Sequence, residues 1–83
     1  YLSKVLNLNS NGLQNLENFN LLHFTFLEEL LLANNNLREI LDLTFSQFKM
    51  LNLLDLKNNQ ISTIYKKAFL NLNNLEILYL NQN

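Results

Sequence analysis

The chain lacks cysteine and proline and has a single glycine, Gly12, among its 83 residues. With no proline, glycine-rich stretch or charged block to form a linker, at most one domain is expected. Lysine and arginine number 6 against 7 acidic residues, and a formal charge of −1 gives no strong field for nucleic acid or an anionic membrane. No apolar run approaches the ~20 residues that span a bilayer, and no signal-peptide pattern is present, so direct membrane insertion by this segment is not expected.

What the sequence does have is leucine at a spacing of 24 residues. One register holds Leu6, Leu30, Leu54 and Leu78, and a second holds Leu8, Leu32, Leu56 and Leu80. The segments that start at Ser3, Leu27, Leu51 and Leu75 follow L-x-x-L-x-L-x-x-N-x-L, with Ser3 in the first leucine slot and the fourth segment cut short. We therefore predict one repeat domain over residues 1–83, with repeats at about 3–26, 27–50 and 51–74 and a partial repeat at 75–83.

The repeat pattern also predicts secondary structure. V-L-N-L, E-L-L-L, L-L-D-L and I-L-Y-L read as short parallel strands whose leucines point inward by the period of two. The return path carries apolar pairs three residues apart, as a helical or 3₁₀ turn would place them: Leu21/Phe24, Phe45/Phe48 and Phe69/Leu72. Return segments of about ten residues are too short for stable helices of their own, so little helix is expected. The predicted class is an α/β repeat solenoid, with strands on one face and loops, 3₁₀ turns or short helical turns on the other.

Asparagine makes up 17 of the 83 residues, and its periodicity argues against an aggregation-prone, low-complexity segment. Asn11, Asn35, Asn59 and Asn83 share the 24-residue register, where a buried amide can satisfy backbone groups left over as the strand bends into its loop. The neighbouring Asn34 and Asn58 are expected to tolerate substitution. No asparagine begins an N-glycosylation sequon.

No residue shows a catalytic or metal-binding pattern. His23 has no second histidine or cysteine to complete a metal site or a nucleophilic pair. Glu28 and Glu29 are adjacent on a predicted strand and face different directions, so they do not form an acid/base pair. Lys66 and Lys67 are typical of a solubilising pair of basic residues. We predict no enzyme activity, no catalytic residues, no metal site and no cofactor.

The outward positions of the predicted strands differ from repeat to repeat. Leu31, Leu53, Ile77 and Tyr79 are apolar or aromatic where the core does not require it, and charged residues lie around them. The alternative is an ordinary surface, since scattered exposed apolar residues are common. The partner-binding residues that we predict on the concave face are Glu29, Leu31, Leu53, Asp55, Lys57, Ile77 and Tyr79.

Over essentially all 83 residues the chain resembles the 24-residue typical leucine-rich repeat family of animal extracellular and receptor proteins. The segment I-S-T-I-Y-K-K-A-F-L-N-L-N-N-L-E-I-L-Y-L, Ile61 to Leu80, is similar to the A-F-x-N-L-x-N-L form of Toll-type receptors and neuronal ectodomains. The resemblance implies a horseshoe segment whose concave sheet binds a protein or other macromolecular ligand. It also implies an extracellular or cell-surface location and a role in recognition and signalling.

Two features depart from that family. Glu17, Leu41 and Tyr65 stand where a proline often follows the second apolar position, and cysteine-rich caps are missing, as expected for an internal piece of a longer array. Because disulfides of repeat proteins commonly sit in caps, the missing cysteine leaves the compartment open. A cytoplasmic scaffold and the substrate-recognition arm of a larger enzyme remain alternatives, since fold does not fix function.

Overall fold

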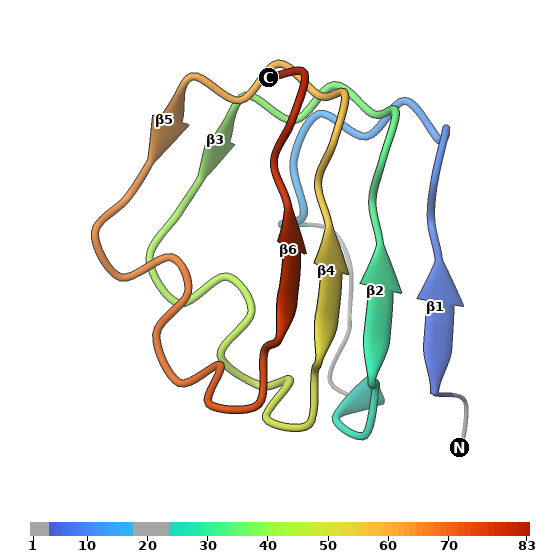
Figure 1. Ribbon diagram of the computed structural model, residues 1–83. Helices are drawn as coiled ribbons and strands as arrows, with labels where there is room; N and C mark the ends of the chain where they lie inside the picture. Colours follow the sequence, from blue (N-terminus) through green and yellow to red (C-terminus); the bar gives the residue numbers. More distant parts are fainter. Residues whose placement is uncertain (1–3, 18–23) are drawn as a thin grey trace.

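The computed structural model describes residues 4–17 and 24–83. Within these ranges it has six short strands: β1 (Val5–Asn7), β2 (Glu29–Leu31), β3 (Glu39–Ile40), β4 (Leu53–Asp55), β5 (Thr63–Ile64) and β6 (Ile77–Tyr79). Strands β1, β2, β4 and β6 form a parallel sheet in that order, and β3 pairs with β5 in a second, two-stranded parallel sheet. The chain winds as a coil, with the larger sheet on one side and β3 and β5 on the other (Figure 1). The result is a solenoid of stacked repeats.

The strand register confirms the one that the leucine spacing predicts. Leu30 pairs with Leu6 on one side and Leu54 on the other. The inward leucines of the two central strands are fully buried, namely Leu30, Leu32, Leu54 and Leu56. Leu78 on β6 is partly exposed, because β6 has a neighbouring strand on one side only.

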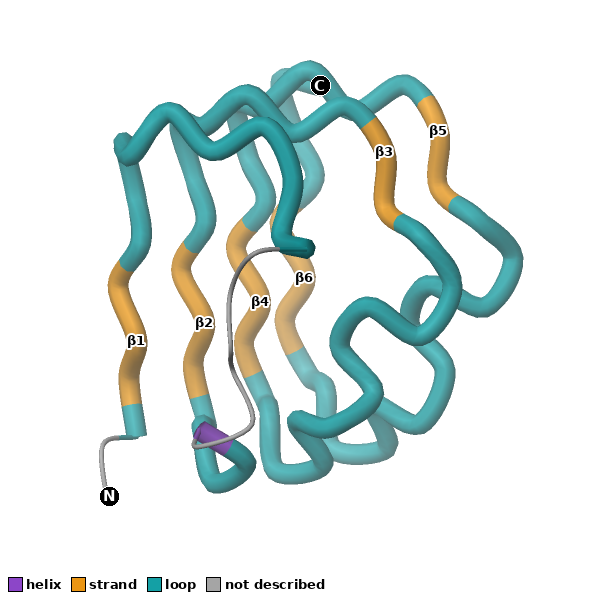
Figure 2. The backbone as a smooth tube through the Cα atoms, turned by 180° about the vertical axis from the view of Figure 1, so that it is seen from behind, coloured by secondary structure: helices purple, strands orange, loops and turns teal. Residues whose placement is uncertain are grey.

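The return side differs from the expected α/β class. In the described residues it holds no α-helix, only β3, β5, turns and a short 3₁₀ turn at Phe24 (Figure 2). Single turns are closed by bonds such as Phe48 N–H to Phe45 O (3.0 Å) and Leu75 N–H to Leu72 O (3.2 Å). Successive turns are not joined into a helix, because each return segment is short and must also turn back to the next strand. The α component of the predicted class is therefore wrong for the described part of the chain, whereas the expectation of little helix is confirmed.

Aromatic rings fill the space between the return side and the large sheet. Phe45 and Phe48 are fully buried, and the Phe45 ring stacks on Phe69 with centroids 6.2 Å apart and planes inclined by 4°. Phe24 and Leu72 pack against the same core. This confirms the predicted apolar column, except at Leu21, which lies outside the described residues.

The asparagines on the shared register satisfy backbone groups as predicted. Asn59 is buried, its Nδ2 donates to the carbonyls of Leu32 and Leu56 at 3.0 Å each, and its Oδ1 accepts from Leu37 N–H at 3.1 Å. Asn35 repeats the arrangement 24 residues earlier, donating to Leu8 O and Leu32 O at 3.0 Å each. A buried amide therefore ties the ends of β2 and β4 to the preceding repeat, whereas Asn11 and Asn83 on the same register are exposed.

The residues just before these asparagines adopt left-handed backbone conformations. The φ angles of Asn34 and Asn58 are 58° and 54°, and Ser10 and Gln82 on the same register have φ of 59° and 62°. The Asn58 Nδ2 also donates to the Asn34 Oδ1. Asparagine adopts this conformation more readily than most residues, so the expectation that Asn34 and Asn58 tolerate substitution must be revised.

Candidate partner-binding site

The seven residues predicted to bind a partner lie together on the solvent side of the large sheet. Register places Glu29, Leu53 and Ile77 in one row across β2, β4 and β6. Leu31, Asp55 and Tyr79 form the next row, and Lys57 follows the end of β4. Neighbouring strands are ~4.8 Å apart, so the rows are contiguous. We call this surface the outer sheet face, defined as Glu29, Leu31, Leu53, Asp55, Lys57, Ile77 and Tyr79.

The sequence predicts Asp55 as one of the charged residues around the apolar patch. The structure buries it, leaving only 6% of the residue exposed. It lies between Leu31 and Tyr79 in its row. Its Oδ1 accepts from the backbone N–H of Lys57 at 3.1 Å, and its Oδ2 is 3.4 Å from the Lys57 Nζ. Asp55 is therefore an internally paired group that fixes its neighbours rather than a charge presented to a partner.

Lys57 links Asp55 to the aromatic ring of the face. Its Nζ lies 5.3 Å from the centroid of the Tyr79 ring, within the range of a cation–π interaction. Because Lys57 offsets the charge of Asp55, Glu29 is the one charge of the outer sheet face that no described ion pair balances. The face is thus mainly apolar, and the ammonium group of Lys57 lies over the ring of its tyrosine.

The apolar residues of the outer sheet face differ in exposure. Ile77 and Tyr79 are each 42% exposed, while Leu31 and Leu53 are half-buried between neighbouring strands. Val5 on β1 lies in the same row as Glu29 and is also exposed. The sequence prediction left Val5 out of the site, although its place in the row could be read from the 24-residue spacing.

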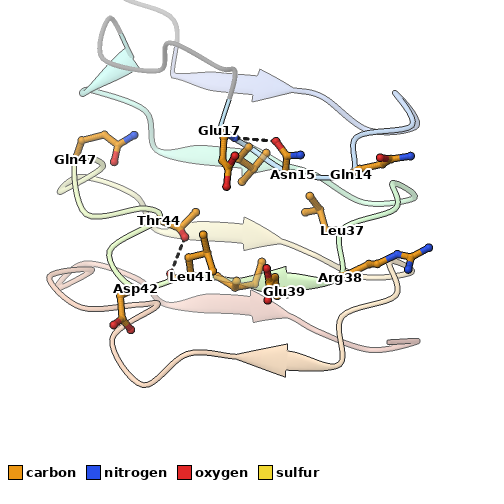
Figure 3. Close-up of a pocket in the computed structure, with 12 residues that line it drawn as sticks. Gln14, Asn15, Glu17, Leu37, Arg38, Glu39, Leu41, Asp42, Thr44 and Gln47 are labelled. Atoms are coloured by element: carbon orange, nitrogen blue, oxygen red, sulfur yellow. Dashed lines mark hydrogen bonds between the residues drawn. The ribbon is translucent and has the colours of Figure 1, made fainter.

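A groove of about 730 Å³ opens on the return side, away from the outer sheet face. Residues 14–17 of the first repeat form one wall, and β3 with its flanking residues forms the other (Figure 3). Sequence reasoning missed this groove because it arises where two return segments separate, which no residue pattern encodes.

The described residues show no group of three or more histidine, cysteine, aspartate or glutamate side chains that could hold a metal ion. His23 lies outside the described ranges. Within residues 4–17 and 24–83, no helix is long and apolar enough to cross a membrane. Buried side-chain nitrogen and oxygen atoms of the described residues all have hydrogen-bond partners, so the core offers no orphan group for a ligand.

The repeat pattern matches that of a known protein family. A sequence profile described as "Leucine rich repeat" matches residues 25–83, which is well over half of the chain. The matched range includes β2 to β6 and every residue of the outer sheet face. No curated protein matches the chain.

Proposed function

The chain belongs to the leucine-rich repeat family, and from this we propose that it is a protein-binding module with its partner site on the outer sheet face. Repeats of this family generally mediate protein binding and are typically not enzymes. The observation that carries the proposal is the exposure of Ile77 and Tyr79 beside Leu31 and Leu53 on three adjacent strands. Clustered apolar and aromatic side chains of this kind are what the centre of a protein interface requires.

The Asp55 and Lys57 pair supports the proposal through its effect on Tyr79. A ring held by a cation 5.3 Å from its centroid has fewer orientations to lose when a partner covers it. Binding then costs less side-chain entropy, which is about 0.5–1.5 kcal/mol for each side chain that must be immobilised. Tyr79 is accordingly the residue expected to contribute most to affinity.

Photo-crosslinking followed by calorimetry tests the proposed site. A photoreactive amino acid at position 79 of the full-length protein should capture the partner, whereas the same group at Leu70, exposed on the return side, should not. With the partner purified, Tyr79→Ala should raise the Kd by about fivefold or more, equivalent to about 1 kcal/mol.

Lys66→Ala and Lys67→Ala are the matched controls, because both side chains are exposed on the return side and lie outside the outer sheet face. Each should leave the Kd within about twofold of the unmodified protein, the range of a near-neutral contact. If the lysine variants weaken binding more than Tyr79→Ala does, the partner site lies on the return side and the proposal fails.

We further propose that this module is part of the ectodomain of a receptor or a secreted protein, with the outer sheet face on the concave side of a horseshoe. The similarity of Ile61 to Leu80 to Toll-type and neuronal ectodomain repeats supports this location. An epitope tag on the full-length protein should be stained on intact cells without permeabilisation. Staining only after permeabilisation would favour the intracellular scaffold, and a catalytic domain on the same polypeptide would favour the enzyme arm.

A further inference from the structure

The return side carries an open strand edge. In the described part of the chain, β3 pairs with β5 alone. On that side the repeats are joined by Ser62 N–H to Arg38 O (3.0 Å) and Tyr65 N–H to Ile40 O (2.9 Å). Residues 15 and 16 stand 24 positions before β3, yet they do not pair with it as a third strand. The other edge of β3 therefore faces the groove.

The groove begins where the first two repeats separate. Asn36 N–H still donates to Leu13 O at 2.8 Å, so the repeats are joined just before β3. Beyond this point, Figure 3 shows Asn15 and Glu17 on one side and Arg38, Glu39 and Leu41 on the other. A volume of about 730 Å³ lies within the range of sites that hold a ligand.

The lining of the groove has an apolar floor and an acidic rim. Leu37 and Ile40 are almost completely buried, and Leu41 adds an apolar wall that is 37% exposed. The charged lining residues are three carboxylates and one guanidinium, and none of them forms an ion pair with another described residue: Glu17, Glu39, Asp42 and Arg38. The excess of carboxylates means that this part of the surface attracts positively charged groups.

We propose that this groove binds an extended, basic segment of a partner protein, which adds to the free edge of β3 as a new strand. An unpaired edge offers backbone donors and acceptors, and adding a strand is a recurring way of recognising peptides. Apolar side chains of the segment would lie against Leu41, and the basic side chains, which point to the other side of an extended strand, would face the carboxylates of the rim.

Fluorescence anisotropy with a labelled probe peptide of alternating lysine and valine tests this proposal. The probe should bind the chain at low ionic strength, and an otherwise identical peptide of alternating glutamate and valine should not. Glu39→Lys should weaken binding of the lysine probe by about tenfold, because it reverses a charge on the rim. Glu76→Lys makes the same charge change at an exposed site outside the groove, and it should change binding by less than about twofold.

Backbone methylation separates strand addition from simple charge attraction. In a strand, successive N–H groups point to opposite edges, so methylating the lysine nitrogens or the valine nitrogens of the probe blocks one edge at a time. One methylated probe should lose binding and the other should keep it. Equal binding of both methylated probes, or of the glutamate probe, would overturn the proposal. The outer sheet face is not involved, so Tyr79→Ala should leave probe binding unchanged whether or not the proposed function holds.

Discussion

The amide of Asn59 is hydrogen-bonded to four backbone groups from two repeats, and its loss should be costly. Asn59→Ala leaves the buried N–H of Leu37 without this partner. The carbonyls of Leu32 and Leu56 each lose one of two amide donors, because Leu32 O also accepts from Asn35 Nδ2 and Leu56 O also accepts from Asn83 Nδ2. An unsatisfied buried group costs about 1–3 kcal/mol, and a hydrogen bond lost from a carbonyl that keeps another donor costs about 0.5–1.5 kcal/mol. We expect the free energy of unfolding to fall by about 2 kcal/mol or more, measured by denaturant titration.

Asn58→Ala is the matched control for this measurement. Its side chain is exposed, but its φ of 54° disfavours alanine by about 1 kcal/mol. The loss at position 58 should therefore be measurable yet clearly smaller. A larger loss for Asn58→Ala than for Asn59→Ala would show that the buried amide is not what ties the repeats together.

Leu43 has a backbone conformation that leucine disfavours. It has a φ of 62°, and its side chain is nearly half exposed. Leucine is unfavourable in the left-handed region, where asparagine is much better tolerated. Leu43→Asn should raise the free energy of unfolding by roughly 0.5–1 kcal/mol, an increase that thermal unfolding would detect. A decrease would mean that the exposed leucine makes packing contacts that outweigh its backbone strain.

Asp55 shows what residue patterns predict and what they miss. Alternation along β4 correctly places it on the side opposite Leu54. Its burial depends on a row in which Leu31 and Tyr79 flank it and on the ion pair with Lys57. Those contacts join residues 24 or more positions apart, or depend on the rotamer of a long side chain, so period-two reasoning could not supply them.

At the scale of single strands, the register can be tested by comparing two adjacent leucines of β4. Leu54 is fully buried, whereas Leu53 is half-buried on the outer sheet face. Leu54→Ala should lower the free energy of unfolding by about 2–5 kcal/mol through lost burial and a residual cavity. Leu53→Ala should cost about 1 kcal/mol or less, because its side chain gives up little buried surface. Similar losses for the two variants would contradict the register.

The large sheet could be predicted from sequence and the small one could not. The leucines of β1, β2, β4 and β6 recur at a fixed spacing and alternate, which defines both strand and register. β3 and β5 are two residues long and carry no alternating pattern. Their pairing follows from the stacking of whole repeats, so the groove beside β3 was equally hidden from sequence reasoning.

For the whole molecule, burial of equivalent residues depends on the repeats on either side. Ile40 and Ile64 pair in register, but Ile40 is 1% exposed and Ile64 is 42% exposed. The difference arises because Ile40 lies between the repeat of Leu16 and the repeat of Ile64, whereas the described residues place an equivalent of Ile64 on one side only. Stability in such an array is approximately a sum over repeats and the interfaces between neighbours.

This nearest-neighbour dependence predicts how the 83-residue chain responds to added repeats. Fusing a capping repeat with a polar outer face to each end should cover Val5 on β1 and Leu78 on β6, and it should pair the free edges of both strands. The capped chain should unfold at a higher denaturant concentration and sediment as a monomer. The uncapped chain should associate as its concentration rises, because its exposed apolar ends and strand edges can pair with those of a second copy. If both forms sediment as monomers and unfold at the same denaturant concentration, stacking at the ends contributes little, and the stability must come from contacts within each repeat.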